Sequence, residues 1–166
     1  MSRTAADALR HEIERALPRL RGIGETESAA RQAPGQWSAR EVLGHLIDSA
    51  SNNHQRFVRA QLQEDLVFEG YDQEAWVRSQ RYAEAPWTDL IELWRAFNLH
   101  LARVIDAVPE GARTLPRARH NLDRIAWKGV PKEVPATLEY FMRDYVGHLR
   151  HHLDQIVPER GPLRPS

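Results

Sequence analysis

Apolar residues recur every three or four positions in four long stretches of the chain, which is the spacing of one face of an α-helix. The stretches cover residues 4–21, 39–63, 86–108 and 137–157. No stretch alternates apolar and polar residues as a half-buried β-strand does. The pattern therefore predicts an all-α protein built on four long amphipathic helices.

The start of the second predicted helix carries two sequence signals. Ser38 and Glu41 have the spacing of a capping box, in which the side chain of each residue accepts a hydrogen bond from the backbone N–H of the other. Trp37 and Val42 flank this pair as a hydrophobic staple. We therefore expect the helix to begin at Ala39.

The segments between the predicted helices are long. Residues 22–36 are rich in small and polar residues and predict a loop, and residues 66–85 predict a mixed connection with a short helix over 72–80. Residues 111–135 form an irregular excursion that is long enough to cover a bundle end, and such loops are often functional. Together these features predict one domain, residues 1–166, folded as a four-helix bundle with long crossover connections.

Composition excludes several classes of protein. The chain is 42% hydrophobic and has 23 basic against 23 acidic residues, so its charge predicts neither a nucleic-acid nor a membrane partner. No apolar run is long enough for a membrane span or a signal peptide, and we expect a cytoplasmic protein. Because the chain has no cysteine, any metal must be held by nitrogen and oxygen ligands.

A polar stripe runs beside the apolar face of the second predicted helix. Its members are three, four or seven residues apart, so they share a face: His45, Asp48, Ser49, Asn52 and Arg56. A polar stripe that flanks a core stripe is what a wet pocket between helices requires. We therefore expect Asn52 and Arg56 to be candidate pocket residues.

Histidines cluster in the last predicted helix, at His148, His151 and His152. Because His148 and His152 are four apart, they can bind one ion from the same face, and His45 is the candidate third ligand. Three imidazoles leave a coordination position open, as in catalytic zinc sites, although nickel, copper and iron also accept imidazole.

The spacing leaves alternatives open. The histidines could lie on the surface, and His151 offers another pairing with His148. Asp48 could hold the free ring nitrogen of His45, act as a ligand or base, or be solvated. Gln155 could line the pocket or simply form a hydrogen bond across the bundle. Four other histidines have no partner at useful spacing or point to another face, which favours surface or packing roles: His11, His54, His100 and His120.

Two motifs resemble known sequences. The first motif resembles the second helix of the DinB/YfiT-like superfamily and comprises residues 37–38 (WS), 41–48 (EVLGHLID) and 52–57 (NNHQRF). The second motif, residues 145–156 (YVGHLRHHLDQI), resembles the last bundle helix of that superfamily. The resemblance covers nearly the whole chain in element order. It implies a four-helix bundle with crossover connections that often forms homodimers.

The resemblance also implies a site and a chemistry. It assigns His45, His148 and His152 as ligands of one divalent ion, zinc or nickel. Members include S-transferases that use bacillithiol, mycothiol or glutathione, and a mycothiol-dependent maleylpyruvate isomerase. We therefore expect a metal-dependent thiol S-transferase or hydrolase with a small-molecule substrate, in which Arg56 and Arg143 are candidate anchors for carboxylates. The alternatives are a non-catalytic binding module and a metal-free dimerising bundle.

Overall fold

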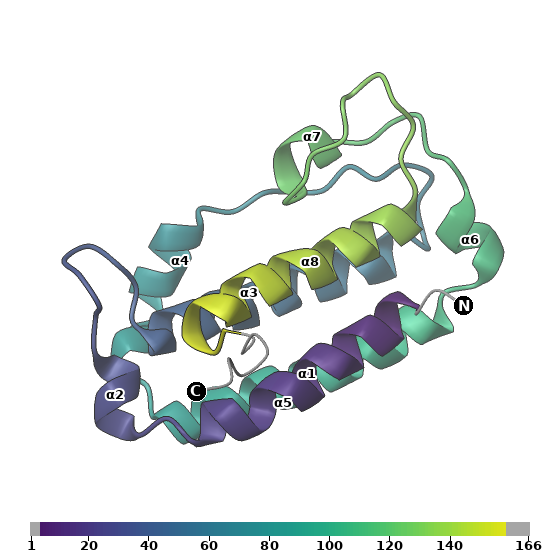
Figure 1. The fold of residues 1–166 in the computed structure, drawn as a ribbon. Helices are drawn as coiled ribbons and strands as arrows, with labels where there is room; N and C mark the ends of the chain where they lie inside the picture. Colours follow the sequence, from purple (N-terminus) through teal and green to yellow (C-terminus); the bar gives the residue numbers. More distant parts are fainter. Residues whose placement is uncertain (1–3, 159–166) are drawn as a thin grey trace, which may run out of the picture.

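Four long helices form the body of the protein in a computed structural model that describes residues 4–158 (Figure 1). They are α1 (Ala5–Arg21), α3 (Ala39–Arg59), α5 (Trp87–Ala107) and α8 (Leu138–Ile156). The prediction of an all-α four-helix bundle is confirmed. None of the described helices combines the length and the apolar content that a bilayer crossing requires.

Side-chain caps fix where three of the helices begin. The Ser38 hydroxyl accepts a hydrogen bond from the Glu41 N–H at 3.3 Å, and the Glu41 carboxylate accepts one from the Ser38 N–H at 2.8 Å. This is the predicted capping box of α3. The hydroxyls of Thr4 and Thr137 cap α1 and α8, each by accepting one hydrogen bond from a backbone N–H of the first turn.

Helix α3 ends at Arg59, four residues before the predicted end at Gln63. The buried Arg117 explains the early end, because its guanidinium donates to the carbonyl oxygens of Ala60 and Gln63 at 3.0 and 3.1 Å. These acceptors would otherwise be the unpaired carbonyls of a helix terminus. The capping group comes from a distant segment, so the local sequence does not reveal it.

The order of the helices around the bundle differs from that of an up-and-down bundle. Both α1 and α3 pack against α5 and α8, so α1 and α3 stand at opposite corners although they follow one another in the chain. The apolar stripes meet in one core, whose largest fully buried side chains include Trp87, Trp94, Phe57 and Phe141.

The long connections make this order possible. Figure 1 shows the chain leaving α3 and running back along the bundle to α4 (Gln73–Ser79), so that α3 and α5 point the same way. A 3-10 turn, η1 (Tyr82–Glu84), follows α4 and leads into α5. The prediction of a short helix within this connection is confirmed.

The loop predicted over residues 22–36 instead contains a short helix, α2 (Glu25–Ala29). Tertiary contacts explain the difference. The Glu25 carboxylate accepts hydrogen bonds from the N–H of Trp87 and from Arg40, and the Ser28 hydroxyl, which is buried, donates to the Glu25 carbonyl oxygen. Contacts with α3 and α5 therefore stabilise a helix that the local composition does not favour.

The excursion between α5 and α8 carries α6 (Glu110–Thr114) and α7 (Leu122–Ile125). Backbone hydrogen bonds join it to the crossover connection: Leu66 donates to Arg119 at 3.0 Å and Asn121 donates to Leu66 at 3.2 Å. As a result α7 lies over the flank of the bundle beside α8 rather than over an end (Figure 1).

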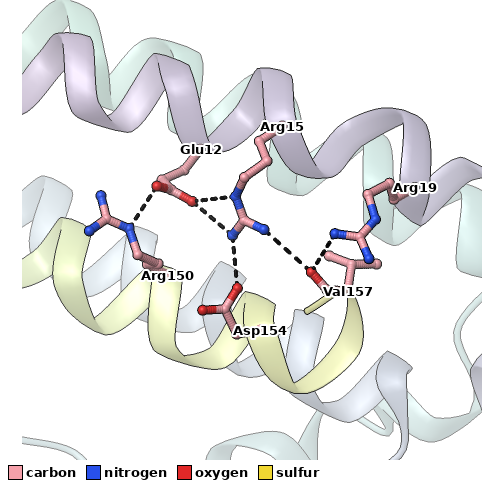
Figure 2. Close-up of polar contacts among 6 residues, drawn as sticks. All are labelled: Glu12, Arg15, Arg19, Arg150, Asp154 and Val157. Carbon is pink, nitrogen blue, oxygen red and sulfur yellow. Dashed lines mark hydrogen bonds and ion pairs between the residues drawn. The ribbon is translucent and has the colours of Figure 1, made fainter. Parts of the chain in front are cut away.

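An ion network around the buried Glu12 joins α1 to α8 (Figure 2). Glu12 of α1 accepts hydrogen bonds from Arg15 at 3.0 Å and from Arg150 of α8 at 2.7 Å. Arg15 also reaches Asp154 at 3.1 Å and the carbonyl oxygen of Val157 at 3.3 Å. The Glu12 carboxylate therefore holds the helix that carries two of the candidate metal ligands.

We predict that Glu12→Ala lowers the free energy of unfolding by about 2 kcal/mol, because it leaves Arg15 largely buried with less negative charge around it. The matched control is Asp106→Ala, which removes an exposed ion pair with Arg10 between α1 and α5 and should cost less than about 1 kcal/mol. Urea denaturation measures both values, and equal effects would contradict the prediction.

Candidate metal centre

Three histidines from two helices converge beside the core. His45 comes from α3, and His148 and His152 come from successive turns of α8. One ring nitrogen of each lies within 4.8 Å of the others. The structure thus brings together the three residues that the sequence singled out. Their role as ligands remains a prediction.

The chemical state of the three rings suits metal binding. Burial lowers the pKa of His45 to about 4 and that of His148 to about 3, and it also lowers the pKa of His152. All three rings are therefore neutral near pH 7, and the neutral ring is the form that binds metal ions.

The distances also fit an ion. The Nε2 atoms of His45 and His148 face one another at 3.3 Å. Two nitrogen ligands at about 2.0–2.1 Å from a tetrahedral zinc ion stand roughly 3.4 Å apart. Two facing nitrogen lone pairs repel, so either a proton on one ring or a cation lies between them, and a separation of 3.3 Å suits both arrangements.

Gln155 orients one of the candidate ligands. Its side-chain oxygen lies 3.0 Å from His152 Nδ1, so the ring donates this N–H and keeps Nε2 free to bind a metal. Gln155 also lines a cavity, and its role as a pocket residue stays a prediction. His151, in contrast, is exposed and lies outside the cluster, with its ring 5.4 Å from that of Trp127.

Asp48 lies away from the three histidines. Its Oδ1 accepts hydrogen bonds from Tyr82 at 2.7 Å and from Gln80 at 2.8 Å, and burial raises its pKa. Among the described residues, the Nδ1 atom of His45 has no hydrogen-bond partner, so Asp48 does not hold that ring. Asp48 follows His45 by three residues, so its side chain leaves the helix roughly 60° around the axis from that of His45. This direction leads toward α4 and η1 instead.

A cavity of about 270 Å³ opens beside His148 and His152, and Arg56 lines it as the polar stripe predicted. Asn52 does not line it: its amide donates to the Asp48 carbonyl oxygen, and its neighbour Asn53 takes the place in the wall. The rest of the wall comes largely from connections that the sequence analysis did not assign to the site, and includes Tyr71, Arg124 and Trp127. The length of the 111–135 excursion was the one sequence signal for Arg124 and Trp127.

Asp144 holds the backbone that carries Trp127. Its two carboxylate oxygens each accept a backbone N–H at 2.8 Å, from Trp127 and from Lys128. Because Gly147 has no side chain, the indole can lie against α8, where even a Cβ atom at residue 147 would stand 3.1 Å from it. The ring thereby forms a wall of the cavity, with its centroid 6.4 Å from that of His148.

A second cavity, of about 530 Å³, lies on another side of the histidines. Trp37, Val42, Ile156 and Gln155 contribute to its lining, and the Trp37 ring centroid is 5.2 Å from that of His45. His152 lines both cavities. Two separate cavities therefore adjoin one of the three histidines.

The remaining histidines of the described chain take no part in this cluster. His120 is buried and its Nε2 lies 2.7 Å from the Val134 carbonyl oxygen, which is a packing role. His54 packs its ring against that of His100 of α5, 5.2 Å away, on a different face of α3. Sequence spacing did not reveal this pair, because its members come from different helices.

Comparison with known proteins agrees with the fold. The sequence model of the DinB superfamily matches residues 8–156, and the chain belongs to this superfamily. A solved structure of YfiT from Bacillus subtilis, described as a probable metal-dependent hydrolase with an unusual four-helix bundle topology, is similar with a TM-score of 0.72. The identity is 20%, and the match covers 92% of this chain and 82% of that one. Among curated proteins no sequence matches.

Proposed function

We propose that His45, His148 and His152 bind one divalent ion, zinc or nickel, and that the protein is a metal-dependent enzyme for a small-molecule substrate. The observation that carries this proposal is the convergence of three neutral imidazoles, with two Nε2 atoms 3.3 Å apart. Among the described residues no second side chain orients the His45 ring through its Nδ1, so the packing of α3 alone sets the direction of this ring.

Three protein ligands leave a coordination position free for a reactant. An ion bound there would lower the pKa of a water or thiol that occupies this position, so that the nucleophile is available at neutral pH. The protein's own residues prepare the site: Gln155 fixes the tautomer of His152, and Trp127 closes the cavity wall beside His148.

Two nucleophiles compete as candidates, each with its own support. The similarity to a structure described as a probable metal-dependent hydrolase favours water. The two cavities that meet at His152 favour a group transfer between two reactants, one of them a thiol. Since the chain has no cysteine, that thiol would have to be a small molecule.

The test is a turnover assay with metal-loaded protein on p-nitrophenyl acetate and on 1-chloro-2,4-dinitrobenzene, each with and without glutathione or bacillithiol. We expect removal of the metal by a chelator to lower the rate at least about tenfold, and re-addition of zinc or nickel to restore it. Ester turnover without thiol would identify a hydrolase, and turnover of the electrophile only with thiol would identify a transferase.

The His54→Ala variant is the control, because His54 packs against His100 on a different face of α3 and lines neither cavity beside the cluster. It should retain the rate. Metal binding without turnover of either probe would favour the non-catalytic binding module, and a rate that is unchanged after metal removal would overturn the proposal.

A further inference from the structure

Arg56 is a buried cation with no anionic partner among the residues that the structure describes. The residue is only 6% exposed, and no carboxylate of residues 4–158 lies within ion-pair distance of it. Its Nη2 donates to the Glu69 carbonyl oxygen at 2.7 Å, which holds the guanidinium in place but does not neutralise it. Burial of an unpaired charge is costly, and here it lowers the pKa of Arg56. Such a cost is compensated when an anion binds.

Arg56 lines the cavity that leads to the histidines. Its guanidinium lies 6.0 Å from the ring centroid of Tyr71, and Tyr71 lines this cavity together with Arg56. Burial raises the pKa of Tyr71 to about 12, so its hydroxyl stays protonated and can donate a hydrogen bond. Ser49 and Asn53 supply further neutral polar groups to the same wall.

The charges that line the cavity are mainly positive. Arg56 lies inside and the exposed Arg124 of α7 lies at the rim, whereas Asp144 is the one acidic residue of the lining. Both Asp144 oxygens already accept backbone N–H groups of residues 127 and 128, which reduces their effect on a ligand. A volume of about 270 Å³ suits a small molecule.

We propose that this cavity binds a small organic anion whose carboxylate or phosphate oxygens are held by Arg56, while the rest of the molecule extends toward His148 and His152. The planar guanidinium matches the two oxygens of such a group. The extension of the ligand toward the histidines rests on the proposed function, because it places the reacting part of the ligand at the metal. The anion site at Arg56 does not depend on the proposed function.

Calorimetric titration of the metal-free protein tests the anion site, since no metal is then present to bind the probe. The probes are glutarate, its neutral counterpart glutaramide, and inorganic phosphate. We expect glutarate or phosphate to bind, glutaramide to bind at least tenfold more weakly, and Arg56→Gln to weaken anion binding at least tenfold. A preference for phosphate or for glutarate identifies which oxyanion the ligand carries.

The matched control is Arg119→Gln, which removes an exposed arginine outside the cavity lining and should leave anion binding unchanged. Circular dichroism and thermal melting verify that Arg56→Gln folds. If it does not, Arg124→Gln at the rim serves instead, with an expected weakening of about threefold. Equal affinity for glutarate and glutaramide, or no loss in a folded Arg56→Gln, would overturn the proposal.

The same titration with His148→Ala separates the two proposals. Arg56-dependent anion binding that persists in a variant unable to hold metal supports the anion site by itself. A wild type that takes up metal but shows no preference for anions refutes the anion site and leaves the metal proposal standing.

Discussion

Protein purified without an affinity tag or added metal should contain about one zinc or nickel per chain, and His148→Ala should contain almost none. His148 supplies the nitrogen that faces His45 at 3.3 Å, so its loss leaves two imidazoles, too few to hold the ion through purification. Elemental analysis by mass spectrometry measures both proteins directly. Activity should fall with the metal.

His151→Ala is the matched variant for this measurement, because it removes a histidine of the same helix that lies outside the cluster. It should keep the full metal content. Retention of metal by His148→Ala, or its loss from both variants, would contradict the assignment of ligands. A wild-type protein that contains no metal and takes none up on titration would leave a helical binding or dimerising module.

Gly44→Ala should lower the free energy of unfolding by about 2–3 kcal/mol, although alanine normally stabilises a helix interior relative to glycine by about 1 kcal/mol. The Tyr82 ring lies directly on Gly44, and an added Cβ would stand 2.3 Å from its Cγ and Cδ2 atoms. Tyr82 is buried and its hydroxyl is bound to Asp48, so the ring has little freedom to move. Urea denaturation measures the loss.

Gly111→Ala is the control, because a Cβ at residue 111, within α6, would meet no atom within 4 Å. It should be neutral or slightly stabilising. The double variant Gly44→Ala/Tyr82→Ala should recover part of the loss relative to the sum of the single changes, since the clash is removed with the ring. Additive effects, or stabilisation by Gly44→Ala, would show that Tyr82 does not constrain this position.

Local sequence determined the four long helices and the candidate ligands of the site. Helical periodicity located α1, α3, α5 and α8, and the capping box placed the start of α3 at Ala39, because caps and apolar stripes act within one or two turns. The four-residue spacing placed His148 and His152 on one face for the same reason.

The tertiary structure decided everything that depends on groups distant in the chain. Arg117 ends α3 early, and the backbone of residues 25–29 becomes helical through contacts with Arg40 and Trp87. Asp48 turns to Tyr82, a partner that arrives with the crossover connection. Such contacts follow from how the chain returns upon itself, and local patterns do not encode that path.

The walls of the site show the same division. His45 was a candidate from its stripe alone, but the packing of α3 against α8 brought it to 3.3 Å from His148. The position of Trp127 in the cavity wall depends on Asp144 and on the missing side chain of Gly147, and both of these residues belong to α8. Sequence by itself therefore determined which residues offer metal-binding chemistry, whereas the tertiary structure decided which of them meet, because convergence of side chains is a property of packing between helices.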